Sequence, residues 1–185
     1  MTARATRALG LLLAAALLGA CAHLPVGGDG LSFEERRARL EAFAHWEMRG
    51  RLAVDTPDAG GFQGSFEWRQ AADHLSLAVR GPLGAGALRV AGTPSALEVT
   101  SRGETWALRD PETELSEMLG WWLPVASLRD WLLGLPDRDH RVRVEPGPEG
   151  VVESLEQRLW RLDYVTYQLR EGLLIPRRID MSHGA

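Results

Sequence analysis

The amino-acid sequence predicts a mainly β domain in which an antiparallel sheet wraps around a few short helices. Two observations support this fold class. Between Glu47 and Leu108, apolar and polar side chains alternate with a period of two, which is typical of strands buried on one face. Short turns rich in Gly, Pro and Asp separate these runs, and two helical segments follow, at 110–120 and 127–134. We therefore expect a one-sided sheet that wraps around two very short helices.

The first 20 residues have the pattern of a secretory signal peptide. Arg4 and Arg7 precede an apolar run from Ala8 to Ala20, which is too short to cross a bilayer as a helix. The single cysteine of the chain, Cys21, comes directly after Leu-Gly-Ala. This arrangement resembles the lipobox of bacterial lipoproteins. The resemblance implies cleavage after Ala20 and acylation of Cys21, which would anchor the domain to a membrane through lipid.

Residues 21–30 are rich in Gly and Pro, and we expect them to be a lipidated tether between the anchor and a domain at 31–185. The domain begins with a capping box, in which Ser32 is the N-cap and Glu35 follows three residues later. The apolar spacing after it predicts an amphipathic helix of roughly 14 residues.

Six strands are predicted in a row after this helix. Short turns join them, so they should form an antiparallel meander. Their inward-facing apolar residues are Met48, Leu52 and Val54; Phe62, Phe66 and Trp68; Leu75, Leu77 and Val79; Leu88 and Val90; Leu97 and Val99; and Trp106 and Leu108.

Two short helices follow the meander. Asp110 is expected to cap the first, with Pro111 in its first turn and Gly120 at its end, and the second is expected to begin near Ser127 and end at Gly134. Residues 137–150 are polar and typical of turns. Two final strands are predicted at about 159–169 and 173–179, joined by a turn at 171–172. The expected total is about eight strands.

Composition argues against several classes of function. The formal net charge is −4 before Arg4 and Arg7 leave with the signal peptide, so the mature chain is acidic and we expect no nucleic-acid partner. The five histidines are scattered, with no metal-ligand spacing, and no nucleophile motif is present. We therefore expect a monomeric protein that is not an enzyme and has no catalytic residue, metal or cofactor.

Seven tryptophans are a heavy aromatic load for a chain of this size. One interpretation is an ordinary filled aromatic core. The other is a cleft between the sheet and the short helices, which an apolar ligand would occupy. The sequence leaves both interpretations open.

An ordered set of short motifs resembles one known family, the LolB outer-membrane lipoprotein receptors. The motifs cover nearly the whole mature chain. They are Trp46 with Arg49-Gly50-Arg51-Leu52, Phe66-Glu67-Trp68, Gly81-Pro82-Leu83-Gly84, Leu119-Gly120, Leu123-Pro124-Val125, and the run from Leu128 to Pro136. Residues 157–164 and Leu174-Ile175-Pro176 also match the family's pattern.

The resemblance implies an unclosed antiparallel β-barrel wrapped around short helices and enclosing an apolar cavity. It also implies a function: accepting mature lipoproteins from the periplasmic carrier LolA and inserting them into the outer membrane, from its periplasmic face. Ala22, after Cys21, agrees with this location, because an Asp there would suggest retention in the inner membrane.

The resemblance and the strand pattern together predict the site residues. The loop of Gly81, Pro82, Leu83 and Gly84 should contact the inner leaflet of the outer membrane, with Leu83 at its tip. The acyl-chain cavity should be lined by Phe66, Trp68, Leu77, Leu88, Val90, Trp106, Leu128, Trp131 and Leu132.

Two further expectations remain open. The family pattern continues with one more strand after Pro176, so the last strand is expected to be missing here, which would leave a sheet edge unpaired. The alternative function is a lipid-anchored periplasmic scaffold of an envelope assembly complex, with a filled core in place of a cavity.

Overall fold

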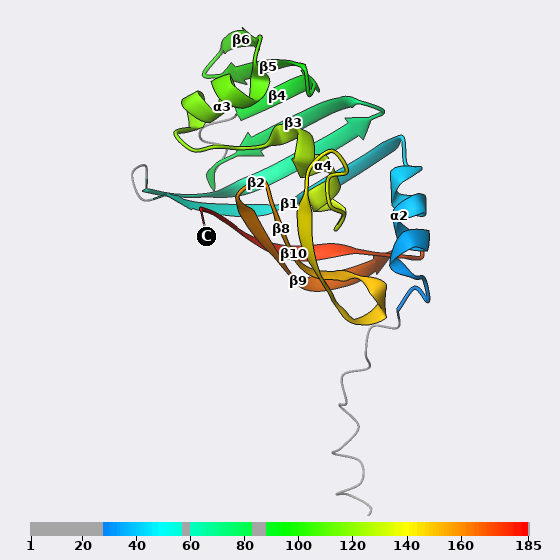
Figure 1. Cartoon of the computed structure of the whole chain (residues 1–185). Coiled ribbons are helices and arrows are strands. Elements are labelled where there is room, and N and C mark those ends of the chain that lie inside the picture. Colours follow the sequence, from blue (N-terminus) through cyan, green and yellow to red (C-terminus); the bar gives the residue numbers. More distant parts are fainter. Residues whose placement is uncertain (1–27, 57–59, 83–87, 185) are drawn as a thin grey trace, which may run out of the picture.

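The computed structural model describes residues 28–56, 60–82 and 88–184. The signal peptide, Cys21, Leu83 and Gly84 lie outside the described residues. Within them the chain forms two antiparallel sheets, with helices packed between and beside them (Figure 1).

The first sheet is the predicted meander, which the structure confirms. Its strands follow one another in chain order, and every neighbouring pair is antiparallel. They are β1 (His45–Thr56), β2 (Gly60–Ala71), β3 (His74–Arg80), β4 (Leu88–Thr93), β5 (Ala96–Ser101) and β6 (Glu104–Leu108).

The second sheet has four strands in the order β10-β9-β8-β7. These are β7 (Val142–Pro146), β8 (Val152–Gln157), β9 (Trp160–Arg170) and β10 (Leu173–His183), with a 3-10 turn, η2 (Pro148–Gly150), between the first two. Over the described residues the two sheets are separate, so the arrangement is unclosed, as predicted. The expected single sheet of about eight strands is corrected to ten strands in two sheets.

The strands β7 and β8 lie in a segment where no strand was predicted from the sequence. In β7, Val142 and Val144 alternate with Arg143 and Glu145, but the strand has only five residues and all of them are exposed. In β8, Ser154 and Gln157 take buried positions that apolar residues would normally fill. The strand β8 was missed because the period-two pattern depends on a difference in polarity between the faces, and the short alternation in β7 lies within a polar segment that is typical of turns.

Three α-helices complete the described fold: α2 (Phe33–Glu41), α3 (Pro111–Leu119) and α4 (Val125–Leu132). The capping box of α2 is confirmed, but the helix has 9 residues and not roughly 14, because β1 already begins at His45. Helix α3 runs from Pro111 to a left-handed Gly120, as predicted. Helix α4 begins at Val125, two residues earlier than expected.

Helix α4 lies between the two sheets (Figure 1). Leu128 on this helix packs against a cluster on the inner face of the six-stranded sheet and also against a cluster on the four-stranded sheet. A third cluster joins Leu40 of α2 to Leu133, Leu135 and Leu173. Helix α4 therefore packs against both sheets.

The N-terminal end of the described chain is held by a buried ion pair. Asp29 accepts hydrogen bonds from Nε and Nη2 of Arg36 at 2.7 and 2.6 Å, and from the Leu174 backbone N–H at 2.8 Å. Arg36 also donates to the Gly150 carbonyl at 2.6 Å. Contacts with the domain thus begin at Asp29, within the segment that was predicted to be the tether.

Candidate functional site

The inner face of the six-stranded sheet is apolar, and one half of it is covered by helices. Strand register places its covered residues in two adjacent rows across the sheet. These residues, at most 6% exposed, are Trp68, Leu75, Val90, Leu97, Val99 and Leu108. Leu115 of α3 and Val125 of α4 pack on them. This half of the face is filled core.

The other half of the inner face is only partly covered. The next rows of the sheet carry Phe66, Val79 and Leu88, and then Leu52 with Gly64 opposite. Phe66, Val79, Leu88 and Leu52 are half-buried. Phe62, further along β2, is 37% exposed. We call these five apolar residues the open face. It ends beside the β1–β2 hairpin and the β3–β4 connection.

Two glycines allow aromatic rings to lie flat on this face. A Cβ on Gly50 would lie 2.6 Å from the ring of Phe66. A Cβ on Gly64 would lie 2.9 Å from the ring of Phe62. Both distances are shorter than any normal carbon–carbon contact. The small residues therefore lower the sheet surface beneath the rings and keep the open face shallow and apolar.

The cavity residues predicted from sequence fall into three groups. Trp68 and Val90 are in the filled half, at 1% and 2% exposure, and Phe66, Leu77, Leu88, Leu128 and Leu132 are half-buried residues packed against that cluster. Trp106 is on the inner face but is 38% exposed. Trp131 is in the other cluster, on the four-stranded sheet. The structure brings most of the set together in one cluster, which does not include Trp106 or Trp131.

Trp131 is fully buried, and its polar atoms are satisfied. Its Nε1–H donates to Oε1 of Gln157 at 2.8 Å, and the Tyr164 hydroxyl donates to the Trp131 carbonyl at 3.0 Å. Gln157 also accepts from the Asp137 backbone N–H at 3.0 Å. These contacts fix α4 to β8 and β9, so Trp131 has a structural role in the second cluster.

A stacked pair of indoles lies at the boundary of the filled half. The rings of Trp46 and Trp68 are 6.2 Å apart and nearly parallel, at 7°. Trp68 Nε1 donates to Gln70 Oε1 at 3.0 Å, whereas Trp46 Nε1 is buried with no hydrogen-bond partner in the described structure. Trp46 belongs to a sequence motif but was not predicted among the cavity residues. Trp46 lies two residues before Met48 near the start of β1, so the alternation along the strand could have placed both on the inner face.

Trp106 lies beside a shallow groove of about 500 Å³ between β6 and α3. The groove is also lined by Leu108, Glu114, Glu117 and Met118. Alternation along β6 correctly predicted an inward-facing Trp106, but α3 covers only part of that strand. The predicted enclosed apolar cavity is not seen among the described residues.

Trp121 and Trp122, the bulky link between the helices, join an aromatic group at the β8–β9 turn. Trp121 meets Trp160 edge-on at 6.0 Å. The Arg158 guanidinium lies 4.8 Å from the centre of the Trp122 ring and forms an ion pair with Glu112 at 2.5 Å. These contacts attach the turn to α3.

Two carboxyl groups near the ends of α4 have shifted pKa values. Burial raises the pKa of Asp130 to about 6, although Arg129 opposes the shift. Burial also raises the pKa of Asp137, but hydrogen bonds from Ser127, the Asp139 N–H and His140 outweigh it, so the net shift is downward. Asp137 shares its Oδ2 between Ser127 at 2.6 Å and His140 at 2.8 Å. This arrangement ties the fully buried Ser127 of α4 to the segment that follows the helix.

The remaining predicted site residues are only partly described. In the membrane loop, Gly81 is half-buried and Pro82 is exposed, whereas Leu83 and Gly84 lie outside the described residues, as does Cys21. None of the described helices is long and apolar enough to cross a membrane. Over the described ranges, no cluster of three or more His, Cys, Asp or Glu residues could hold a metal ion.

Comparison with known proteins gives a consistent result. A family model described as "Outer membrane lipoprotein LolB" matches residues 44–185. A protein named "Outer-membrane lipoprotein LolB" from Alkalilimnicola ehrlichii is 39% identical over 176 residues, which are 93% of this chain and 88% of the relative. Relatives with the same name from Stutzerimonas stutzeri and Pseudomonas savastanoi are 35% and 34% identical, and the matches cover 91% of this chain and 84% and 85% of the relatives.

Proposed function

The chain belongs to the LolB family of outer-membrane lipoproteins, and we propose that it accepts mature lipoproteins from the periplasmic carrier LolA and inserts them into the outer membrane. It is an outer-membrane lipoprotein of the lipoprotein-localisation pathway. The finer steps are our proposal: acylation at Cys21, capture of acyl chains by the domain, and release into the inner leaflet.

The observation that carries this proposal is the open face of the six-stranded sheet. An inner face that remains partly exposed costs hydrophobic free energy unless an apolar ligand covers it. Five half-buried or exposed apolar residues lie there together: Leu52, Phe62, Phe66, Val79 and Leu88. We infer that acyl chains of the cargo lie on this face, and that Leu77, Leu128 and Leu132 border it.

Energetics explains why the cargo must be handed over directly. Each buried CH₂ of an acyl chain contributes about 0.8 kcal/mol, so exposing one long chain to water costs on the order of 10 kcal/mol. Release into the periplasm is therefore too slow, and the chains must pass from one apolar surface to another. The transfer runs downhill only if this protein binds acyl chains more tightly than the carrier and the bilayer binds them more tightly still.

The scaffold alternative requires a filled core with no ligand surface. Trp131 and the covered half of the sheet fit such a core, but the open face does not, and membership of the LolB family does not favour it.

A pair of substitutions on adjacent residues of β1 tests the proposal. Leu52 is half-buried on the open face, and Ala53 is exposed on the opposite face. Leu52→Asp should weaken binding of a fluorescent fatty acid about tenfold or more, because its carboxylate would be desolvated against the chain. Ala53→Asp should bind as the wild type does. If the wild type binds no probe, or if both variants bind normally, the open face is not the acyl-chain site.

A further inference from the structure

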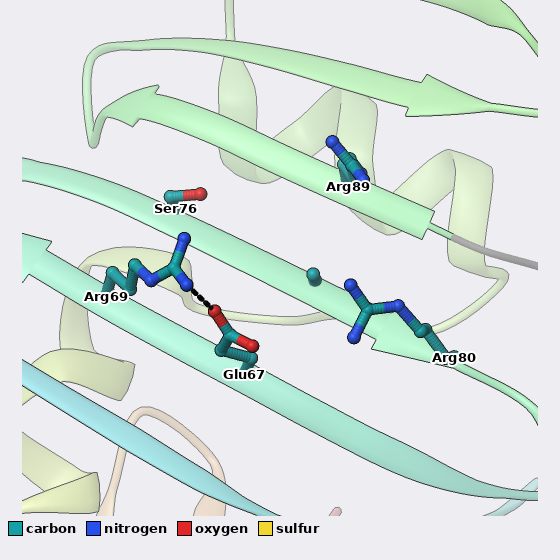
Figure 2. Close-up of a pocket in the computed structure, with 6 residues that line it drawn as sticks. Glu67, Arg69, Ser76, Arg80 and Arg89 are labelled. Atoms are coloured by element: carbon teal, nitrogen blue, oxygen red, sulfur yellow. Dashed lines mark ion pairs between the residues drawn. The ribbon is translucent and has the colours of Figure 1, made fainter.

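The outer face of the six-stranded sheet carries a polar groove that the lipoprotein-transfer function does not use. It has a volume of about 170 Å³ and lies over β2, β3 and β4 (Figure 2). Its lining residues are Glu67, Arg69, Ser76, Ala78, Arg80 and Arg89. Three of the six are arginines, in a chain whose formal net charge is −4. Positive charge is therefore concentrated in this groove.

The arginines of the groove differ in their partners. Arg69 is paired with Glu67 (Figure 2). It is also paired with Glu47, at 3.0 Å. The side chains of Arg80 and Arg89 form no ion pair or hydrogen bond within the described ranges of the chain. Strand register explains this difference, because Arg80 faces Ser65 on β2 and Arg89 faces Ala78 on β3 and Thr100 on β5. Arg80 at the end of β3 and Arg89 on β4 therefore have no carboxylate directly opposite them.

Glu67, the carboxylate among the described residues that line the groove, is already occupied. One of its carboxylate oxygens forms an ion pair with Arg69, and the Nε atom of Arg49 lies 3.4 Å from the other oxygen. Glu47 and Glu67 share Arg49 and Arg69, so this network is balanced and does not cancel Arg80 and Arg89. What remains is a shallow site with two unpaired guanidiniums and the Ser76 hydroxyl. Guanidinium groups bind phosphate oxygens in a forked, bidentate geometry, and a hydroxyl adds one more donor.

We propose that this groove binds the phosphate groups of anionic phospholipids at the membrane surface and so orients the domain on the bilayer. The proposal rests on the outer-membrane location that belongs to the proposed function. A membrane-anchored domain stays close to a dense array of phosphate diesters, which matches the charge of the groove. Arg80 ends β3 and Arg89 is the second residue of β4, so both adjoin the connection that is expected to contact the lipid.

Vesicle binding tests this proposal directly. Residues 22–185 contain every contact of the described domain, so this piece can be used without the acyl anchor. The vesicles are either pure phosphatidylcholine or an equal mixture with phosphatidylglycerol. Arg80→Gln/Arg89→Gln should weaken binding to the anionic vesicles about 30-fold, since each arginine near an anionic surface contributes about 1 kcal/mol. Binding to phosphatidylcholine should not change, and added salt should remove the difference.

A matched control separates the groove from net charge. Arg141 directly precedes β7 and Arg170 ends β9, and both are exposed. The double variant Arg141→Gln/Arg170→Gln removes the same charge. The control should bind anionic vesicles almost as the wild type does, and both double variants should keep the wild-type unfolding midpoint. Equal losses in the two variants, or no loss in the Arg80/Arg89 variant, would overturn the proposal.

Two further measurements separate lipid binding by the groove from capture of a soluble anion and from the transfer function. Glycerol phosphate is a soluble molecule that carries a phosphate group like that of the lipid. If it binds through Arg80 and Arg89 as tightly as anionic vesicles do, the groove is a site for a soluble anion and the proposal is wrong. The Arg80→Gln/Arg89→Gln variant should still bind the fluorescent fatty acid. A protein that binds no fatty acid but keeps the arginine-dependent vesicle binding would contradict the transfer function and leave the groove proposal supported.

Discussion

The indole N–H of Trp131 donates to Oε1 of Gln157 over 2.8 Å, and both side chains are buried, at 0% and 3% exposure. This bond joins the helix between the sheets to β8. Trp131 was predicted to line an acyl-chain cavity, and the structure places it in the buried cluster on the four-stranded sheet. A test of the ligand site must therefore use residues of the open face.

Trp131→Ala should mainly lower stability, whereas Phe66→Ala should mainly weaken fatty-acid binding. Trp131→Ala should lower the free energy of unfolding by about 3–5 kcal/mol, because it leaves a cavity in a filled cluster. Fatty-acid affinity, measured at a temperature where the variant is folded, should change little. Phe66→Ala should cost less stability, since the ring is already partly exposed, but should weaken fatty-acid binding more. Thermal unfolding and probe fluorescence measure the two effects. Equal ligand affinity in Phe66→Ala and the wild type would contradict the assignment of the open face.

Asp29→Asn should destabilise the domain by about 3 kcal/mol, because it leaves Arg36 buried without its charged partner. The Arg36 guanidinium, with help from the Leu174 and Leu31 N–H groups, lowers the pKa of Asp29 to about 2. A lowered pKa stabilises the folded state above the ordinary value of 3.8, and this stability is lost as the pH falls toward 2.

Acid unfolding followed by circular dichroism checks this prediction. The wild type should lose stability between about pH 4 and pH 2 partly through Asp29, and the variant should lack that contribution. Asp73→Asn, at an exposed turn, is the control and should follow the wild-type curve. An Asp29→Asn variant as stable as the wild type at pH 7 would show that the ion pair contributes nothing.

Asp130→Asn should stabilise the protein at neutral pH. Burial raises the pKa of Asp130 to about 6, so the carboxyl favours the folded state below its ordinary value of 3.8 and loses this effect as the pH rises through 6. Replacing it should raise the free energy of unfolding at pH 7 by about 1–2 kcal/mol, after allowance for its partial exposure. Urea unfolding between pH 4 and pH 8 measures the change. If the variant's gain is the same at every pH, the ionisation of Asp130 is not its cause.

Leu83→Glu should separate acceptance of cargo from delivery. Gly81, Pro82 and Gly84 are turn-forming residues, so a charge at this connection should change stability by no more than about 0.5 kcal/mol. The carboxylate should oppose entry of the connection into the lipid interface. The variant should accept cargo from the carrier and fail to pass it to liposomes, so that loaded receptor accumulates. Transfer at the wild-type rate would make Leu83 an incidental surface residue.

Much of the fold could be predicted because most strands have one apolar face. The meander from β1 to β6 follows directly from alternation. The strand β8 could not be found in this way, since its inward Gln157 is satisfied by Trp131, Asp137 and His140, which are distant contacts that only the folded chain brings together.

The candidate site was predicted less completely for a similar reason. Helical spacing placed Leu128 and Trp131 on one apolar side, but α4 lies between two sheets and contributes to two clusters. Alternation also places Arg80 and Arg89 on the outer face. That neither has an acidic partner among the described residues depends on which residues of the neighbouring strands lie beside them, and the alternation within a single strand does not show this.

The most direct test of the proposed function is transfer of an acylated lipoprotein from the loaded carrier LolA to purified residues 22–185. The amount of cargo on each protein is measured after separation. We predict that the cargo moves to this chain, that Ala53→Asp accepts it equally well, and that Leu52→Asp leaves it on the carrier. Cargo that stays on the carrier with the folded wild-type chain present would contradict the proposed function.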